Sequence, residues 1–504
     1  MLDTYYKHGS PMKRYLSVGL LLVSSIVQAD GSTYQQIVEK TIASNPEVQA
    51  AYNNYSAAVQ EQNAARGGFY PHINLISEGR AVEGAQSSAN YNNFVPDYMT
   101  TIVLRQMLFD GFGTLSEVRR LDHAARTRYF ELESAMQRVA METTKAYIDI
   151  QKYRKFVGYA QDNFVVHKQL FNLVEERVLA GVGRRVDLEQ GSGRLALAEA
   201  NLLTETNNLL AVTAVFQRLT GDLPQPILPE VDFVNKGVEG TVDNALEKAF
   251  KSNPDILASI ENIISAEQQV KVKQAQYYPR VDGTARHAID VAQSGENAYS
   301  AADVAEVTLN YNLFNGFTDK SMISQSTFKL NQSHDLRDKA CRDTRETLAV
   351  AYGDIVNLKS QLSYRDQHQL AIEKAREAYR KQFSIGQRTL LDLLDTENEY
   401  FQARRNYTET ERDLYTAYAR TYTSQGDILR KINVVRSDLP EIVQEEGEEY
   451  KVAACNTSIA PELMKINKDE LMLKARPLNP DLRGNIQLQP PMPVADQDPS
   501  TGRN

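Results

Sequence analysis

The feature that most constrains this fold is an internal duplication that runs through most of the chain. Short markers in the first half return in the same order in the second half: Asn45-Pro46 as Asn253-Pro254, Phe109–Phe112 as Phe314–Phe317, and Ala146–Ile150 as Ala351–Ile355. The offset is 208 positions at the first marker and 205 at the other two. Chance does not preserve one offset over so long a stretch, so the chain contains two copies of one structural unit.

Each copy predicts the same order of elements: a helix broken at the Asn-Pro marker, a pair of strands, and a long helical hairpin. The first repeat is expected over 30–236, with its strand pair in 70–109 and its hairpin in 112–221. The second is expected over 237–436, with its strand pair in 278–314 and its hairpin in 317–432. Residues 437–504 are acidic and then proline-rich, so they are expected to form a flexible tail.

The strand segments have one apolar and one polar face. In the second repeat Val307, Leu309, Tyr311 and Leu313 alternate with polar residues. This pattern suits an outer-membrane barrel, and it suits a small soluble sheet equally well. Four strands are too few to close a membrane barrel, so that reading requires several chains, and three copies would supply twelve strands.

The hairpin segments have the heptad spacing of coiled coils. In the first repeat the apolar seam is Val139, Thr143, Ala146, Ile150, Tyr153, Val157, Ala160 and Phe164, and the second repeat has an equivalent seam. The stretch between Gly113 and Gly181 contains no proline, so an unbroken helix would be about 100 Å long. Such a helix must pack on neighbours, and ordinary coiled-coil packing explains each seam residue taken singly.

The chain opens on a targeting segment. Lys13 and Arg14 precede an apolar run, and Val27-Gln28-Ala29 is a small-residue cleavage site, so residues 1–29 are expected to be a signal peptide. A transmembrane anchor is disfavoured because the apolar run is shorter than the roughly 20 residues that a span requires. No cysteine follows the cleavage site, which argues against lipid attachment there. A membrane location for the remaining chain would need β-strands, since no later stretch could span a bilayer as a helix.

Composition excludes several classes of function. The net charge is −9 and there is no long basic cluster, so nucleic acid is not expected as a partner. The two cysteines, Cys341 and Cys455, have no metal or redox spacing. A disulfide between them is one alternative, and two unpaired cysteines are favoured.

Enzyme motifs are absent as well. Gly111-Phe112-Gly113, Gly181-Val182-Gly183 and Gly191-Ser192-Gly193 each lack the third glycine and the strand context of a dinucleotide site. The chain has no P-loop, no H-E-x-x-H and no G-x-S-x-G, and its seven histidines are scattered. The sequence therefore predicts no enzyme, and no catalytic, cofactor or metal site.

The duplicated unit and the motif Gly386–Asp395 resemble the TolC family of outer-membrane channels, over about Thr33 to Arg436. The resemblance implies a mainly α fold with a membrane β-barrel. Three chains would form a twelve-stranded outer-membrane barrel above a periplasmic tunnel of long antiparallel helical hairpins. It also implies that the tunnel docks on a periplasmic adaptor and an inner-membrane pump.

The resemblance also implies roles for residues at the hairpin turns. Asp392 and Asp395 match the aspartates of the periplasmic entrance gate, where threefold symmetry would place six carboxylates. Their spacing of three puts them on one helix face, and the alternative is two solvated acids in the favourable first turn of a helix. Arg388 and Asp187 match a latch that holds the entrance closed. Phe383 stands where a tyrosine also joins that latch, and phenylalanine has no hydroxyl to donate.

Two glycines complete the predicted site. Gly181 and Gly386 resemble the tip glycines on which adaptors dock, and ordinary turn glycines are an equal alternative.

Three functions remain open from the sequence. The stretch Ala180–Gln190 is most similar to the type I secretion branch of the family, which favours export of proteins by an adaptor and an inner-membrane ABC transporter. The first alternative is a multidrug or small-molecule efflux channel with a proton-driven pump. The second is a periplasmic coiled-coil adaptor, which usually carries one hairpin instead of two. For the channel, the expected surroundings are outer-membrane lipid, a homotrimer and an exported protein substrate.

Overall fold

A computed structural model of the chain describes residues 33–83, 94–231, 238, 240–292, 298–434, 455 and 466–474. The predicted signal peptide (1–29) and most of the predicted tail (437–504) lie outside these residues. The chain divides into two compact units, 1–460 and 461–504. The second unit is described at 466–474, which include a short helix, α11 (Lys468–Lys474). The first unit contains all the elements discussed below.

The Asn-Pro markers separate two successive helices in each repeat. Asn45 lies between α1 (Tyr34–Ser44) and α2 (Pro46–Arg66), and Asn253 lies between α5 (Val242–Ser252) and α6 (Pro254–Gln274). The side chain of Asn45 accepts a hydrogen bond from the backbone N–H of Glu47, and that of Asn253 accepts from the N–H groups of Asp255 and Ile256. The proline lacks an N–H at a position where no helical partner exists, so it begins the helix at no cost.

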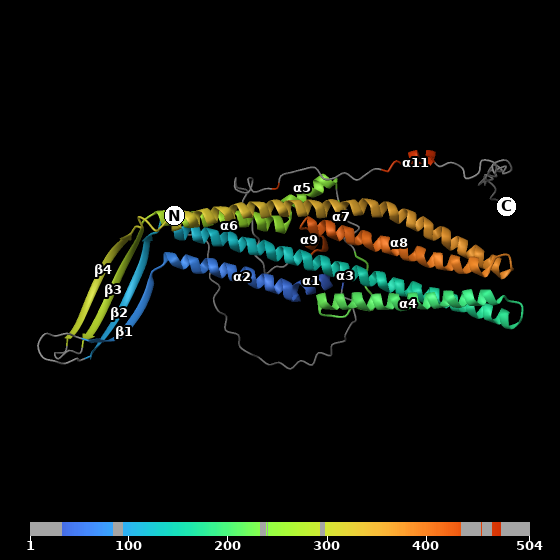
Figure 1. Cartoon of the computed structure of the whole chain (residues 1–504), viewed down its shortest axis with the longest axis horizontal. Coiled ribbons are helices and arrows are strands. Elements are labelled where there is room, and N and C mark those ends of the chain that lie inside the picture. The colour runs from blue at the N-terminus through green and yellow to red at the C-terminus, as the bar shows by residue number, and fades with distance from the viewer. Residues whose placement is uncertain are drawn as a thin grey trace, which may run out of the picture. The chain divides into compact units, whose positions relative to one another are not determined.

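A short turn of 3-10 helix, η1 (Gly67–Phe69) or η3 (Ala275–Tyr277), leads from each helix to the sheet. The strands are β1 (His72–Glu83), β2 (Phe94–Phe109), β3 (Arg280–Ala292) and β4 (Ala298–Asn310). They form one antiparallel sheet in the order β1-β2-β3-β4 (Figure 1). The pairing of β2 with β3 joins the two repeats, for example Thr101 with Ala288. The outer strands β1 and β4 are the two edges of this sheet.

Four long helices follow the strands. We call α3 (Gly113–Leu179) and α4 (Arg185–Thr220) the first helix pair, and α7 (Thr318–Ser384) and α8 (Leu390–Ser424) the second helix pair. Helices α3 and α7 carry the chain away from the sheet, and α4 and α8 return from the turns (Figure 1). Helices α3 and α7 have 67 residues each, so each is about 100 Å long. The sheet lies at one end of the helices and the turns of both pairs at the other (Figure 1). None of the described helices is long and apolar enough to cross a membrane.

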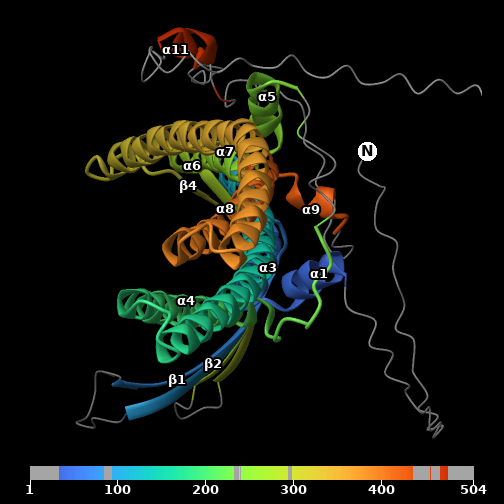
Figure 2. The same cartoon turned by 90° about the vertical axis from the view of Figure 1, so that its right-hand side faces the viewer.

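The largest apolar core lies midway along α3. Tyr147, Ile148 and Ile150 of α3 pack there with Tyr418 and Tyr422 of α8. Helix α1 and the short helix α9 (Ile428–Ile432) cover this core from the same side (Figure 2).

Nearer the turns, the buried positions of α3 differ from the predicted seam. Phe156, Asn163 and His167 are buried, whereas the heptad pattern had pointed to Val157 and Phe164. A straight α-helix drifts relative to a strict seven-residue repeat, and α3 here packs against two helices, α4 and α8.

The segment after α4 is fastened to the helices by side chains. Tyr147 and Gln151 donate hydrogen bonds to the carbonyl of Pro229, both over 2.7 Å. Arg412 of α8 is 1% exposed, and it donates to both carboxylate oxygens of Glu230 over 2.7 and 2.9 Å. These hydrogen bonds lower the pKa of Glu230. Arg412 therefore connects α8 to the segment between the repeats.

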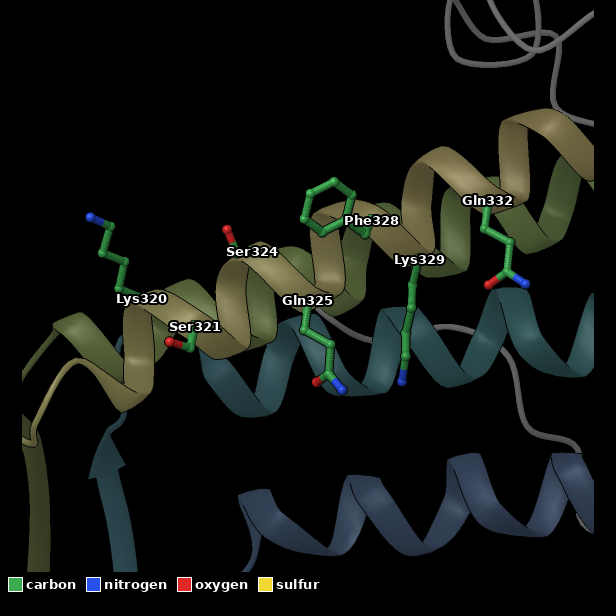
Figure 3. Close-up of a pocket in the computed structure, with 7 residues that line it drawn as sticks. All are labelled: Lys320, Ser321, Ser324, Gln325, Phe328, Lys329 and Gln332. Atoms are coloured by element: carbon green, nitrogen blue, oxygen red, sulfur yellow. The ribbon is translucent and has the colours of Figure 1, made fainter.

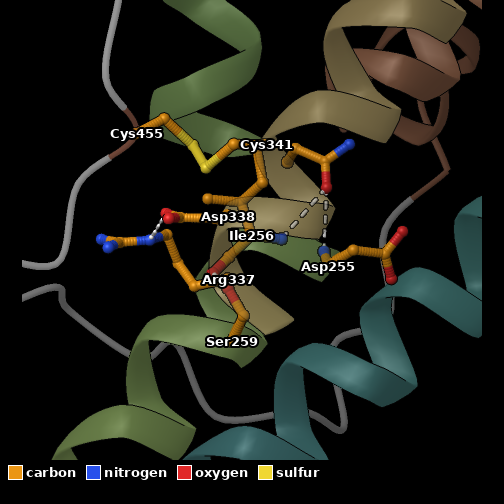
Figure 4. Close-up of a disulfide and its surroundings, with 8 residues drawn as sticks. Asp255, Ile256, Ser259, Arg337, Asp338, Cys341 and Cys455 are labelled. Atoms are coloured by element: carbon orange, nitrogen blue, oxygen red, sulfur yellow. Dashed lines mark hydrogen bonds and ion pairs between the residues drawn. A yellow bond between two sulfur atoms is a disulfide. The ribbon is translucent and has the colours of Figure 1, made fainter. Parts of the chain in front are cut away.

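The cysteines form a disulfide, so the favoured prediction of two unpaired cysteines was wrong. Cys341 of α7 bonds to Cys455, with 5.8 Å between their Cα atoms (Figure 4). The two residues are 114 positions apart in the sequence, and only the folded chain brings them together. Cys455 packs against an apolar cluster of α6 that includes Ile256 and Ile260, so the bond holds Cys455 beside α6 and α7.

Candidate functional site at the turns of the helix pairs

Both turns depend on a glycine with a positive φ. Gly181 (φ 75°) follows α3 and Gly386 (φ 77°) follows α7, and a Cβ at either position would meet no neighbouring atom. The left-handed backbone lets the next N–H bond back to the helix end, as Gln387 does to the carbonyl of Gln382 over 2.9 Å. This geometry accounts for both glycines as turn residues, and their role in adaptor docking stays a prediction.

Asp392 belongs to the capping box at the start of α8, in which Thr389 is the N-cap residue. Its carboxylate accepts hydrogen bonds from the backbone N–H and the hydroxyl of Thr389, and its own N–H donates to that hydroxyl. The hydrogen bonds from Thr389, with a smaller contribution from Arg388, hold the pKa of Asp392 below its ordinary value. Asp392 is therefore an acid in the first helical turn whose ionised form is favoured by its hydrogen bonds.

Asp395 lies one turn further along α8 and forms an ion pair with Arg194 of α4. The side chains of Asp392 and Asp395 are 38% and 52% exposed, so solvent reaches both. The structure thus places both predicted gate residues near the start of α8, and the ion pair with Arg194 connects Asp395 to the first helix pair.

The predicted latch residues do not meet in this single chain. Arg388 donates a hydrogen bond to the side chain of Gln382 over 2.9 Å, and its guanidinium lies 4.3 Å from the ring centre of Tyr379. Its ion-pair partner is Asp392, at 3.8 Å. Asp187 lies in the first turn of α4. A link between Arg388 and Asp187 remains a prediction for the assembled protein.

Phe383 has a packing role instead of a surface one. Its side chain is 8% exposed, in an apolar cluster that joins the two helix pairs near their turns. The other buried members of this tip cluster are Val174, Leu390, Leu393 and Leu394. The guanidinium of Arg177 lies 5.3 Å from the centre of the Phe383 ring. The absence of a hydroxyl therefore suits a buried position.

Sequence reasoning missed a buried charge beside this cluster. Glu397 of α8 is almost fully buried, and it accepts hydrogen bonds from the Nε atoms of Arg376 and Arg380 of α7 over 2.7 and 2.6 Å. Burial lowers the pKa of the nearby His167 of α3. Arg376 and Arg380 are four residues apart and so lie on one face of α7, which was the only sequence signal for this buried carboxylate. Such spacing is also common on exposed helices, so it did not identify the site.

Cavities and metal-ligating clusters do not identify a catalytic centre. Within the described ranges no three acidic, histidine or cysteine side chains are grouped so that they could hold a metal ion. A groove of about 730 Å³ follows the first turns of α7, where it is lined by lysine, serine and glutamine side chains and by Phe328 (Figure 3). This groove lies at the edge of the helical layer and close to the sheet.

Comparison with known proteins agrees with this arrangement. The family model described as "Outer membrane efflux protein" matches two stretches, residues 37–222 and 245–427. The outer membrane protein TolC of Escherichia coli is 23% identical over 414 residues, which cover 78% of this chain and 82% of TolC. The alkaline protease secretion protein AprF of Pseudomonas aeruginosa is 24% identical over 399 residues, covering 75% and 81% of the two chains.

The fold is also shared with solved structures. A crystal structure of CusC superimposes with a TM-score of 0.71 at 15% identity, and the match covers 78% of this chain and 92% of CusC. The family match, the repeated helix pairs and the four-stranded sheet all indicate the same family. The chain therefore belongs to the outer membrane efflux protein family, the TolC-like channels of the outer membrane, which are transport proteins and not enzymes.

Proposed function

We propose that this protein is the outer-membrane channel of a tripartite export machine that secretes proteins by the type I route. The observation that carries the proposal is the stretch Ala180–Gln190 at the first turn, which resembles the type I secretion branch. The similarity to AprF, an alkaline protease secretion protein, supports the same branch. The partners would be a periplasmic adaptor, an inner-membrane ABC transporter and an exported protein.

The channel would be a homotrimer. In one chain the outer edges of β1 and β4 are open, and exposed strand edges are normally paired or covered. The edge helix α7 also exposes apolar side chains: Phe328 is 72% exposed, and Leu336 and Val350 are exposed as well. Three copies joined edge to edge would close a cylinder of twelve strands and bury these helix edges. A heat-sensitive trimer band on a gel tests this assembly.

Asp392 and Asp395 would form the entrance gate of that trimer. Six carboxylates around a narrow opening would favour cations over anions. Replacing both aspartates with asparagine should reduce cation selectivity, measured as the reversal potential in a salt gradient across a planar bilayer. Gly181 and Gly386 would place the two turns against the adaptor.

The deciding experiment compares secreted and cell-surface proteins with and without the gene by mass spectrometry. Loss of one or a few large proteins is the expected result. An unchanged protein profile combined with increased drug sensitivity would favour the efflux alternative. That alternative is supported by similarity to TolC-like efflux channels such as CusC, named as a cation efflux system protein in Escherichia coli. The family match disfavours the adaptor alternative.

A further inference from the structure

A recess of about 800 Å³ lies where helices α3, α6 and α7 meet the strands. Each of these helices contributes one cation to its lining: Arg119 of α3, Lys271 of α6 and Lys320 at the start of α7 (Figure 3). All three side chains are exposed, and none of them forms an ion pair within the described ranges. No aspartate or glutamate is among the described residues that line the recess. Its net charge is therefore positive, which suits an anionic ligand.

Positive charge alone is not a general property of this junction between helices and strands. A neighbouring recess is lined by side chains of both signs, among them Asp110, Asp319 and Arg280. The charge of Arg280 is compensated there, because its guanidinium donates two hydrogen bonds to the carboxylate of Asp282 over 2.8 and 3.1 Å. The three cations of the first recess have no such compensation from the described residues.

The recess with the three cations adjoins the apolar face of the sheet. Phe112 lines the recess, and its ring centre lies 5.6 Å from that of Phe109 in β2. Phe109 pairs with Val281 of β3, which pairs with the exposed Leu309 of β4. Residues paired directly across antiparallel strands have their side chains on one face of the sheet. In an outer-membrane protein, an exposed apolar sheet face of this kind contacts the acyl chains of lipids.

Exposed aromatic side chains mark the level of the membrane surface. Tyr277, Tyr278 and Phe112 all line the recess, and each is more than half exposed. Aromatic residues gather in this way where a membrane meets water. Arg119 lies six positions after Gly113, the first residue of α3, and so about 9 Å along the helix. The headgroup layer on each side of a bilayer is roughly 5–8 Å thick, so the long side chain of Arg119 reaches the depth of lipid phosphates.

We propose that this recess binds the headgroup phosphate of an anionic phospholipid in the adjacent membrane leaflet. Arg119, Lys271 and Lys320 surround the phosphate, and the acyl chains lie along the apolar face of the sheet. Guanidinium and ammonium groups form strong charge-assisted hydrogen bonds with phosphate oxygens. Because no acid lines the described recess, a headgroup with net negative charge is preferred to one whose own cation balances the phosphate. This inference goes beyond the proposed function, since it is the same for every substrate that the channel could carry.

The test uses the purified full-length protein in phosphatidylcholine vesicles, with phosphatidylglycerol as the anionic probe. The chain contains no tryptophan, so Tyr277→Trp places a single fluorescent reporter in the recess. Bromine atoms on acyl chains quench tryptophan at contact, so quenching by brominated forms of each lipid gives their relative affinity for the recess. We expect a preference for phosphatidylglycerol of about fivefold or more, because each cation near an anionic membrane surface contributes roughly that factor.

Two sets of substitutions in this background separate the charges from the fold. Arg119→Gln with Lys271→Gln and Lys320→Gln should remove the preference, so that both lipids quench equally. Arg119→Lys with Lys271→Arg and Lys320→Arg retains the three charges and should retain the preference. Loss of the preference in both sets would overturn the inference, because the charge of the recess would then not be its cause.

A matched control changes the net charge equally at a distance from the sheet. Arg365, Lys374 and Lys381 are exposed cations in the part of α7 that leads to its turn, and their joint replacement by glutamine should leave the preference unchanged. Equal quenching by the two lipids before any cation is replaced would also overturn the inference. So would a preference that disappears when inorganic phosphate is added at constant ionic strength, because the recess would then hold free phosphate instead of lipid.

Discussion

Replacing Phe383 with alanine tests how the two turns are held together. The ring is almost fully buried among Val174, Leu390, Leu393 and Leu394, so its removal leaves a cavity between the helix pairs. Phe→Ala changes in cores cost roughly 3–5 kcal/mol. We expect about 3 kcal/mol here, because helix ends collapse around a cavity more readily than a central core does. Local opening of the turn should then be about 150-fold more populated.

Amide hydrogen exchange in peptides spanning residues 376–396 measures this opening. Exchange of the helical amides should accelerate by about the same 150-fold factor, provided that closing is faster than exchange. Ile385→Ala is the matched control, since Ile385 is only two residues away and 68% exposed, and it should leave the rates within a few-fold. Equal rates in the two variants would refute the idea that the tip cluster fastens the turns.

Three further predictions follow from the fold and the turns. Glu230→Gln should lower the thermal unfolding midpoint at neutral pH and leave it unchanged in acid. Arg412 lowers the pKa of Glu230, so the ion pair stabilises the fold at pH values above the ordinary pKa of glutamate. This stabilisation is lost as the pH falls through the lowered pKa. An equal effect at both pH values would contradict this sign. Cys455→Ser removes a disulfide between residues 114 positions apart, which predicts a loss of up to about 5 kcal/mol in the free energy of unfolding. At a fixed scan rate, the thermal unfolding midpoint of this variant should equal that of the reduced original protein and lie below that of the oxidised one. Gly386→Ala should destabilise the turn by about 1–2 kcal/mol because of its positive φ, whereas Gly193→Ala, inside α4 with free space around it, should not lower the midpoint.

Much of the candidate site could be predicted because its residues occupy positions that the local backbone structure determines. The glycines of the turns mark where long apolar-periodic segments reverse, and the acids that follow mark the start of a helix. Thr389 and Asp392 have the spacing of a capping box, and the structure forms it. The buried ion pairs could not be predicted in this way. Glu397 and Arg412 are charged residues on helices, and such residues normally face water.

The sequence by itself determined the duplication, the helix breaks at Asn45 and Asn253, the alternating strands and the long helices, because each of these depends on local periodicity or on the backbone preferences of a few residues. Only the tertiary structure decided which helices lie side by side, and with them the partners of Arg412 and Cys341. These contacts join residues more than a hundred positions apart. Local pattern carries no information about such pairs, because their meeting depends on the packing of α8 against α3 and of α6 against α7.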